Sequence, residues 1–156
     1  MRVTICAVGR LRPSPERELV DDYLKRCDRT GRPFGFGPVS VVEVEDKKGG
    51  GMAAEVDLLR AAIPDGAVKV VLSERGKLIT SETLSQKIAA WQMDSVRDVA
   101  FIIGGADGLP CDFEAEADLQ LSFGKMVWPH MLVRVLVAEQ LYRAASIMAG
   151  TPYHRA

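Results

Sequence analysis

The end of this chain holds side chains suited to proton transfer and to the recognition of anions. The terminal TPYHRA includes Tyr153, His154 and Arg155, and it follows a long apolar helix pattern that contains Arg143. The other histidine, His130, lies at the start of that pattern. A neutral histidine can accept a proton near physiological pH, and an arginine can stabilise a developing anion. These five residues are the candidates for acid–base chemistry.

Each candidate also has an ordinary structural explanation. Glu139 stands four residues before Arg143, where an ion pair within the helix would account for the arginine. His130 follows Pro129 and could cap the helix or form a structural hydrogen bond. His154 could belong to a disordered terminus.

The sequence lacks the usual patterns of metal, dinucleotide and nucleotide sites. Neither histidine has a Cys or a carboxylate at ligand spacing, and the three cysteines are widely separated. GGADGL does not have the spacing of a dinucleotide fingerprint, and KKGGG has its lysines on the wrong side of the glycines for a phosphate-binding loop. We therefore expect no metal, NAD or ATP.

Strand and helix patterns alternate along the chain, which predicts an α/β fold with a mostly parallel sheet. No internal repeat or linker interrupts this order, so we expect a single domain over 1–156. We expect strands at 2–8, 39–45, 68–73, 99–103 and 119–123, and helices at 15–29, 52–63, about 81–94, 111–117 and 131–149. Ser14, Thr80 or Ser81, and Gly150 have the types expected at helix ends.

Three irregular segments follow predicted strands, at Ser73–Leu78, Gly104–Pro110 and Phe123–Pro129. In an open parallel sheet, ligands bind beyond the carboxyl ends of the strands. The convergence of these segments therefore predicts a ligand site whose walls include backbone groups. The alternative is that the glycines at 104, 105 and 108 only turn the chain.

Composition and charge restrict the class of protein. The net charge is −1, so binding to nucleic acid would depend on local patches. Residues 119–156 hold four basic side chains against Glu139 alone, whereas residues 107–118 hold five acidic side chains without a basic one. No secretory signal or membrane span is recognisable, so we expect a cytoplasmic protein that does not enter a membrane.

The final helix pattern is apolar around most of its circumference. A helix of this kind is buried on more than one side, so one side is expected to face the sheet and another a second subunit. Small residues on the helix would allow a close approach, and Ala145 is the position at which a charge would test this contact. The sequence thus favours a homodimer. The apolar residues are Leu132, Val133, Val135, Leu136, Val137, Leu141, Ile147 and Met148, and the small ones are Ala138, Ala144, Ala145 and Ala149.

Several unusual strings occur in a fixed order: IIGGADGL at 102–109, LSFGKMVWPH at 121–130, LVRVLVAEQLYRA at 132–144 and PYHR at 152–155. With the opening ICAVGRLR and the segment VLSERGK, they extend over essentially the whole chain. On these strings the chain resembles the ribosomal RNA large subunit methyltransferase H family, a compact branch of the knotted SPOUT methyltransferases.

This resemblance implies a SPOUT-type fold with a C-terminal trefoil knot, a homodimer, and S-adenosylmethionine as methyl donor. It implies methylation of N3 of a pseudouridine in large-subunit (23S) ribosomal RNA, either isolated or in the assembled ribosome. It also implies that Leu72, Gly104, Gly105, Phe123, Gly124, Lys125, Met126, Val127 and Trp128 hold the cofactor. Methylation of another RNA such as transfer RNA, and a non-catalytic nucleotide-binding module of ribosome assembly, are the alternatives.

Under this reading, the candidates of the opening paragraph would act on the pseudouridine. A histidine, either His154 or His130, would take the N3 proton, because neutral imidazole is a suitable base. Arg143 and Arg155 would stabilise the base anion or contact phosphate, and Tyr153 would stack or hydrogen-bond.

Overall fold

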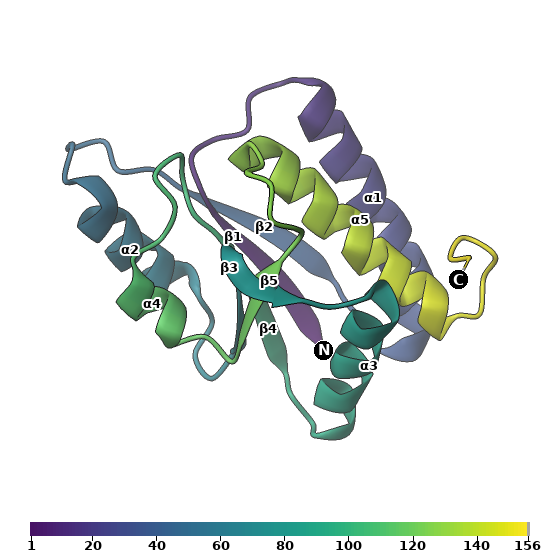
Figure 1. The fold of residues 1–156 in the computed structure, drawn as a ribbon. Coiled ribbons are helices and arrows are strands. Elements are labelled where there is room, and N and C mark those ends of the chain that lie inside the picture. The colour runs from purple at the N-terminus through teal and green to yellow at the C-terminus, as the bar shows by residue number, and fades with distance from the viewer. Residues whose placement is uncertain (156) are drawn as a thin grey trace.

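The computed structural model describes residues 1–155, and its five strands form one parallel sheet in the order β2-β1-β4-β3-β5 (Figure 1). The α/β class and the parallel sheet predicted from the sequence are thereby confirmed. The strands are β1 (Arg2–Val8), β2 (Val39–Val44), β3 (Val68–Leu78), β4 (Asp98–Ile103) and β5 (Leu119–Ser122).

Helices cover both faces of the sheet, three on one side and two on the other (Figure 1). The first group packs over one set of strand side chains, with α5 in contact with both α1 and α3. The helices are α1 (Pro15–Gly31), α2 (Gly51–Ala62), α3 (Ser81–Met93), α4 (Cys111–Ala115) and α5 (His130–Met148), with a short 3-10 helix, η1 (Arg32–Phe34).

Alternation along the strands explains why two cores form. Successive side chains of a strand point to opposite faces, so Ile5 and Phe101 pack in the core under α1, α3 and α5. Cys6 and Ile102 pack in the core under α2 and α4. Two of the three inner strands, β1 and β4, are buried along almost their whole length, as expected for parallel strands covered on both faces.

The helix ends follow local rules that the sequence shows directly. Ser14 accepts a hydrogen bond from the Arg17 amide, and Thr80 accepts one from the Thr83 amide. Gly150 adopts φ of 65°, and the next amide, of Thr151, donates to the Ser146 carbonyl. This arrangement is a Schellman ending, so the predicted glycine cap of the last helix is confirmed.

Strand β3 is longer than the sequence suggested. It continues through Leu78, and its pairing with β5 shifts register between Leu72 and Lys77. Part of the segment expected to be an irregular loop is therefore a bulged strand. Gly76 lies where a Cβ would stand 2.7 Å from the Leu121 carbonyl carbon, so only glycine allows this close approach of the two strands.

The small residues of α5 face the interior of their own chain. Ala138, Ala144 and Ala145 are 0 to 1% exposed and belong to the core shared with α1 and α3. The expectation that Ala145 marks a subunit contact is wrong, because a glutamate there would enter the protein core. Within residues 1–155, no helix is long and apolar enough to cross a membrane.

Candidate functional site

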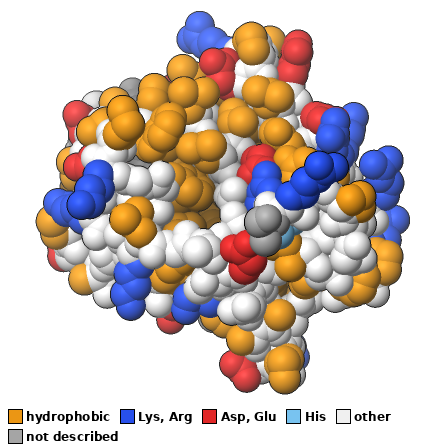
Figure 2. Space-filling model, turned by 45° about the vertical axis from the view of Figure 1, so that its right-hand side comes forward, with side chains coloured by type: hydrophobic (Ala, Val, Ile, Leu, Met, Phe, Trp, Pro, Cys, Tyr) orange, Lys and Arg blue, Asp and Glu red, His pale blue; other side chains and the backbone are white. Residues whose placement is uncertain are grey.

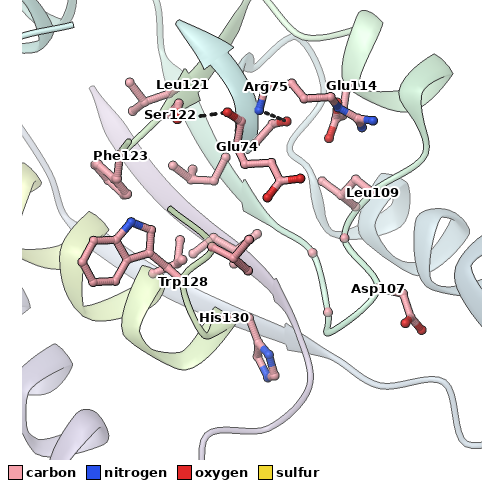
Figure 3. Close-up of a pocket in the computed structure, with 18 of the residues that line it drawn as sticks. Glu74, Arg75, Asp107, Leu109, Glu114, Leu121, Ser122, Phe123, Trp128 and His130 are labelled. Atoms are coloured by element: carbon pink, nitrogen blue, oxygen red, sulfur yellow. Dashed lines mark hydrogen bonds and ion pairs between the residues drawn. The ribbon is translucent and has the colours of Figure 1, made fainter. Parts of the chain in front are cut away.

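A cavity of about 530 Å³ lies at the carboxyl ends of β3, β4 and β5 (Figure 3). It is bordered by the bulge of β3 at 73–75, the turn at 104–110 and the segment between β5 and α5. Figure 3 shows Phe123 and Trp128 on one side and Glu114 and Leu109 on the other. Its size suits a small organic ligand. The convergence of three loops predicted from the sequence is confirmed.

Most of the residues expected to hold a ligand line this cavity. His130, the first residue of α5, also lines it, whereas Lys125 is exposed and lies outside the lining. The expected residues that do line it are Leu72, Gly104, Gly105, Phe123, Gly124, Met126, Val127 and Trp128.

Gly104 and Gly105 shape the wall after β4. A Cβ on Gly104 would stand 2.9 Å from the backbone carbonyl group of Gly108 and from the Leu109 side chain. Gly105 and Gly108 form a bridge, and Gly108 has φ of 74°. The glycines therefore do turn the chain, and the turn that they make is a wall of the cavity.

The hydroxyl of Ser122 joins two of the loops. It lies 2.8 Å from the Gly124 carbonyl oxygen and 3.3 Å from the Glu74 carbonyl oxygen, and it accepts from the Gly124 amide. The end of β5 is thus fixed to the bulge of β3. Gly124 has φ of 137°, a backbone conformation that favours glycine.

Polar residues that the sequence analysis did not select also line the cavity. Arg75 donates to the Glu114 carboxylate at 2.9 Å, and Glu114 is buried. Glu74 and Asp107 stand nearby in the lining (Figure 3). Glu116 pairs in the same way with Arg60, so two of the five acidic side chains in 107–118 have basic partners outside that segment. The sequence showed the acidic segment itself, but not these partners, which are distant in sequence.

The C-terminal tail forms a separate hydrogen-bonded cluster against α3 and α5. Arg143 Nη1 lies 3.2 Å from His154 Nδ1, and His154 Nε2 lies 2.7 Å from the Glu82 carboxylate. Tyr153 donates its hydroxyl to Glu139 at 2.9 Å, and its ring stacks under the Arg143 guanidinium. The alternative of a disordered terminus is wrong for these two tail residues.

These contacts fix the tautomer of His154. A guanidinium can only donate, so Nδ1 must accept from Arg143 and carries no proton. A carboxylate can only accept, so Nε2 must donate to Glu82. The ring is therefore neutral in this arrangement, and its one basic nitrogen is occupied by Arg143. His154 can accept a proton only after this contact opens.

Electrostatic effects within the cluster keep its other members in defined states. The pKa of Glu82 is lowered to about 2 by its own backbone amide, the Thr80 hydroxyl and His154, so Glu82 is ionised at neutral pH. The pKa of Tyr153 is raised by burial and by its hydrogen bond to Glu139. Tyr153 is thus a donor and a packing group rather than a base.

The catalytic candidates fall into two groups at opposite ends of α5. His130 lines the cavity, whereas Arg143 lies thirteen residues further along the helix, about 20 Å away at 1.5 Å per residue. Arg143, Tyr153 and His154 form the tail cluster, and Arg155 is exposed beside it. One chain does not bring the two groups together. The predicted ion pair of Arg143 with Glu139 is present at 2.6 Å.

Cysteine reactivity offers a first test of the cavity. Burial raises the pKa of Cys6 to about 11 and that of Cys27 to about 12, so both thiols stay protonated at pH 8. Cys111 is exposed and lines the cavity. We expect iodoacetamide at pH 8 to give one rapid adduct, on Cys111, because the thiolate is the reactive form. Peptide mass spectrometry checks this, and rapid labelling of Cys6 or Cys27 would contradict it.

Comparison with known proteins adds sequence and fold relationships. Residues 1–154 match a family model described as "Predicted SPOUT methyltransferase". The chain is 63% identical to the ribosomal RNA large subunit methyltransferase H of Dinoroseobacter shibae and 61% identical to that of Ruegeria pomeroyi, in each case over 99% of both chains. A probable methyltransferase from Bordetella pertussis shares the fold, with a TM-score of 0.54 and 14% identity over 92% of this chain and 95% of that one.

Proposed function

The chain belongs to the SPOUT methyltransferase family, and from this premise we propose that it is a single-domain enzyme that transfers a methyl group from S-adenosylmethionine to large-subunit ribosomal RNA. The observation that carries the proposal is the cavity at the carboxyl ends of β3, β4 and β5. The finer assignment is N3 of a pseudouridine in 23S RNA, with the enzyme acting in the cytoplasm. The trefoil knot stays part of this proposal.

The residues of the cavity fit S-adenosylmethionine in size and charge. Leu72 and Met126 offer apolar contact to the adenine, and the glycines at 104, 105 and 108 present backbone groups without intervening side chains. The carboxylates of Glu74 and Asp107, which have no ion-pair partner among residues 1–155, suit a ligand that carries a positive sulfonium and an ammonium group. When bound, the cofactor supplies an electrophilic methyl group.

The residues of the chain would then hold the accepting nitrogen and remove its proton. Positioning alone can provide much of the acceleration when the two reacting atoms are held in line. His154 would accept the N3 proton at Nδ1 once RNA displaces Arg143, which is then free to stabilise the anionic base. His130 is the alternative base within the cavity itself.

A homodimer would bring the two groups of candidates together. A stripe along α5 is exposed or only partly buried, and it runs from the cavity end to the tail cluster. If two copies pair antiparallel along this stripe, each tail cluster approaches the cavity of the other copy, as a two-fold axis requires. Figure 2 shows hydrophobic side chains around a hollow, with Lys and Arg side chains on several sides of it. The stripe includes Leu132, Leu136, Glu139, Gln140 and Arg143.

The homodimer predicts a position-dependent effect of added charge. Leu132 is 38% exposed, so a glutamate there would be hydrated in the monomer but poorly solvated in the contact. We expect Leu132→Glu to weaken dimerisation at least tenfold. Met93→Glu, at an exposed apolar residue at the end of α3, is the matched control. Light scattering measures the mass, and a parent protein that stays monomeric at high micromolar concentration would contradict the homodimer.

Mapping of RNA methylation tests the activity itself. Ribosomal and transfer RNA from cells with and without this protein would be digested and analysed by mass spectrometry. We expect loss of one methyl group from a large-subunit pseudouridine in the cells without it, restored by the gene. Loss of a methyl group from transfer RNA alone would show that transfer RNA is the substrate. Unchanged methylation of both RNAs would favour the alternative of a non-catalytic nucleotide-binding module of ribosome assembly.

A further inference from the structure

Five exposed basic side chains stand on loops at the edge of the sheet where the cavity opens. Arg10 and Arg12 follow β1, Lys47 and Lys48 follow β2, and Lys125 follows β5. None of them forms an ion pair with any residue between 1 and 155. Since β1, β2 and β5 are parallel, these loops leave the sheet on the same side as the cavity walls. We call these five residues the basic rim.

The loops after β1 and β2 are held to each other by hydrogen bonds. The Gly9 amide donates to the Val44 carbonyl at 2.7 Å, and the Leu11 amide donates to the Glu43 carboxylate. Asp46 accepts from the amides of Lys48 and Gly50. The carboxylates of Glu43 and Asp46 thus serve the backbone of the loops, which leaves the basic side chains facing solvent.

Arg134 connects these loops to the cavity. The residue is 2% exposed, and its guanidinium donates to the carbonyls of Val8 and Gly9 at 2.7 and 2.6 Å and pairs with Glu43 at 2.8 Å. The residue before it on α5, Val133, lines the cavity. The basic loops and the cavity are therefore held in a fixed relation through a buried charge with several partners.

The cavity wall also lies close to the end of β1. A Cβ built on Gly105 would lie 3.1 Å from Val8 Cγ1, and Val8 ends β1 just before Arg10. The basic rim therefore starts beside the cavity mouth.

We propose that the basic rim binds the phosphates of the RNA substrate on either side of the nucleotide that enters the cavity. The inference rests on the proposed function and adds the surface by which RNA is held. Long, unpaired cations track a phosphate backbone without reading sequence, whereas the contacts inside a pocket select the base. Glu45, Glu74 and Asp107 are exposed acidic side chains on adjoining segments, and the five cations of the rim outnumber them.

Two double variants test the basic rim. Arg10→Gln with Arg12→Gln removes the charge after β1, and Lys47→Gln with Lys48→Gln removes the charge after β2. Arg32→Gln with Arg97→Gln is the matched control, because these exposed arginines precede β2 and β4 at the opposite edge of the sheet and the charge change is equal. The probes are a fluorescein-labelled single-stranded RNA of about 20 nucleotides, titrated at several salt concentrations, and purified large ribosomal subunits that lack the modification.

We expect each rim variant to bind the RNA about tenfold more weakly at low salt and to lower the slope of log Kd against log salt by about 1.4, since each lost contact contributes about 0.7. The KM for ribosomal subunits should rise while kcat, S-adenosylmethionine affinity and Tm match those of the control. If the parent protein methylates RNA but the rim variants equal the control in salt slope and KM, the inference is overturned and the proposed function stands. A parent protein that methylates no RNA would overturn the proposed function and the inference together.

Discussion

Replacing His154 by alanine is expected to lower the single-turnover rate of RNA methylation by about 10² to 10⁴, the usual contribution of a general acid–base group. The residue is held between Arg143 and Glu82 with a single basic nitrogen, so its loss removes the proton acceptor proposed for N3. His154 does not line the cavity and is proposed to act on the RNA base, so affinity for S-adenosylmethionine should be unchanged.

A matched variant separates proton transfer from packing of the tail. His154→Gln retains an amide that can contact both Arg143 and Glu82, but it cannot carry a proton under these conditions. We expect His154→Gln to have the melting temperature of the parent protein and a methylation rate as low as that of His154→Ala. A parental rate for His154→Ala would show that His154 is not the base and would leave His130, which lines the cavity, as the candidate.

Gly104→Val is expected to weaken S-adenosylmethionine binding by about 100-fold. The new Cβ would meet the Gly108 carbonyl group and Leu109 at 2.9 Å, so the turn that walls the cavity must move. Losing two or three backbone contacts of about 1 kcal/mol each corresponds to this change in affinity. Titration calorimetry measures it.

The same clash carries a cost for the fold, so the melting profile is not expected to stay unchanged. Forcing extra atoms into a packed site costs about 1–3 kcal/mol. Gly66→Ala is the control, because Gly66 has φ of 72° in an open turn before β3 and its substitution strains the backbone away from the cavity. Gly66→Ala should lower Tm and retain affinity. Undiminished affinity in Gly104→Val would contradict the assignment of the cavity.

Local features were predictable from the sequence, and contacts between distant segments were not. Ser14 and Gly150 act within one turn of their own helices, so residue type alone indicated their roles. The pairing of Arg75 with Glu114 joins residues 39 apart, and no local pattern specifies such a partner. For this reason the charged wall of the cavity was missed although its glycines were found.

The division of the catalytic candidates was only partly predictable from the sequence. Tyr153 and His154 were selected for their chemistry, and the helix length alone would have placed Arg143 far from His130. The contacts of His154 with Glu82 depend on how α3 packs against α5, which is a property of the tertiary structure. Ala145 was expected at a subunit contact but is buried within its own chain. A helix that is apolar on all sides does not reveal which side faces the core and which side faces a partner.

The bonds of Arg134 also bear on how the newly made chain reaches its native state. This arginine needs the carbonyl of Val8, 126 residues earlier, and α5 packs against α1 from the other end of the chain. During synthesis, the first four strands emerge well before the helix that covers one face of their sheet. Contacts of such long sequence separation slow folding and leave apolar surface uncovered meanwhile. Nascent chains that stop short of α5 should therefore be open to chaperone capture and proteolysis.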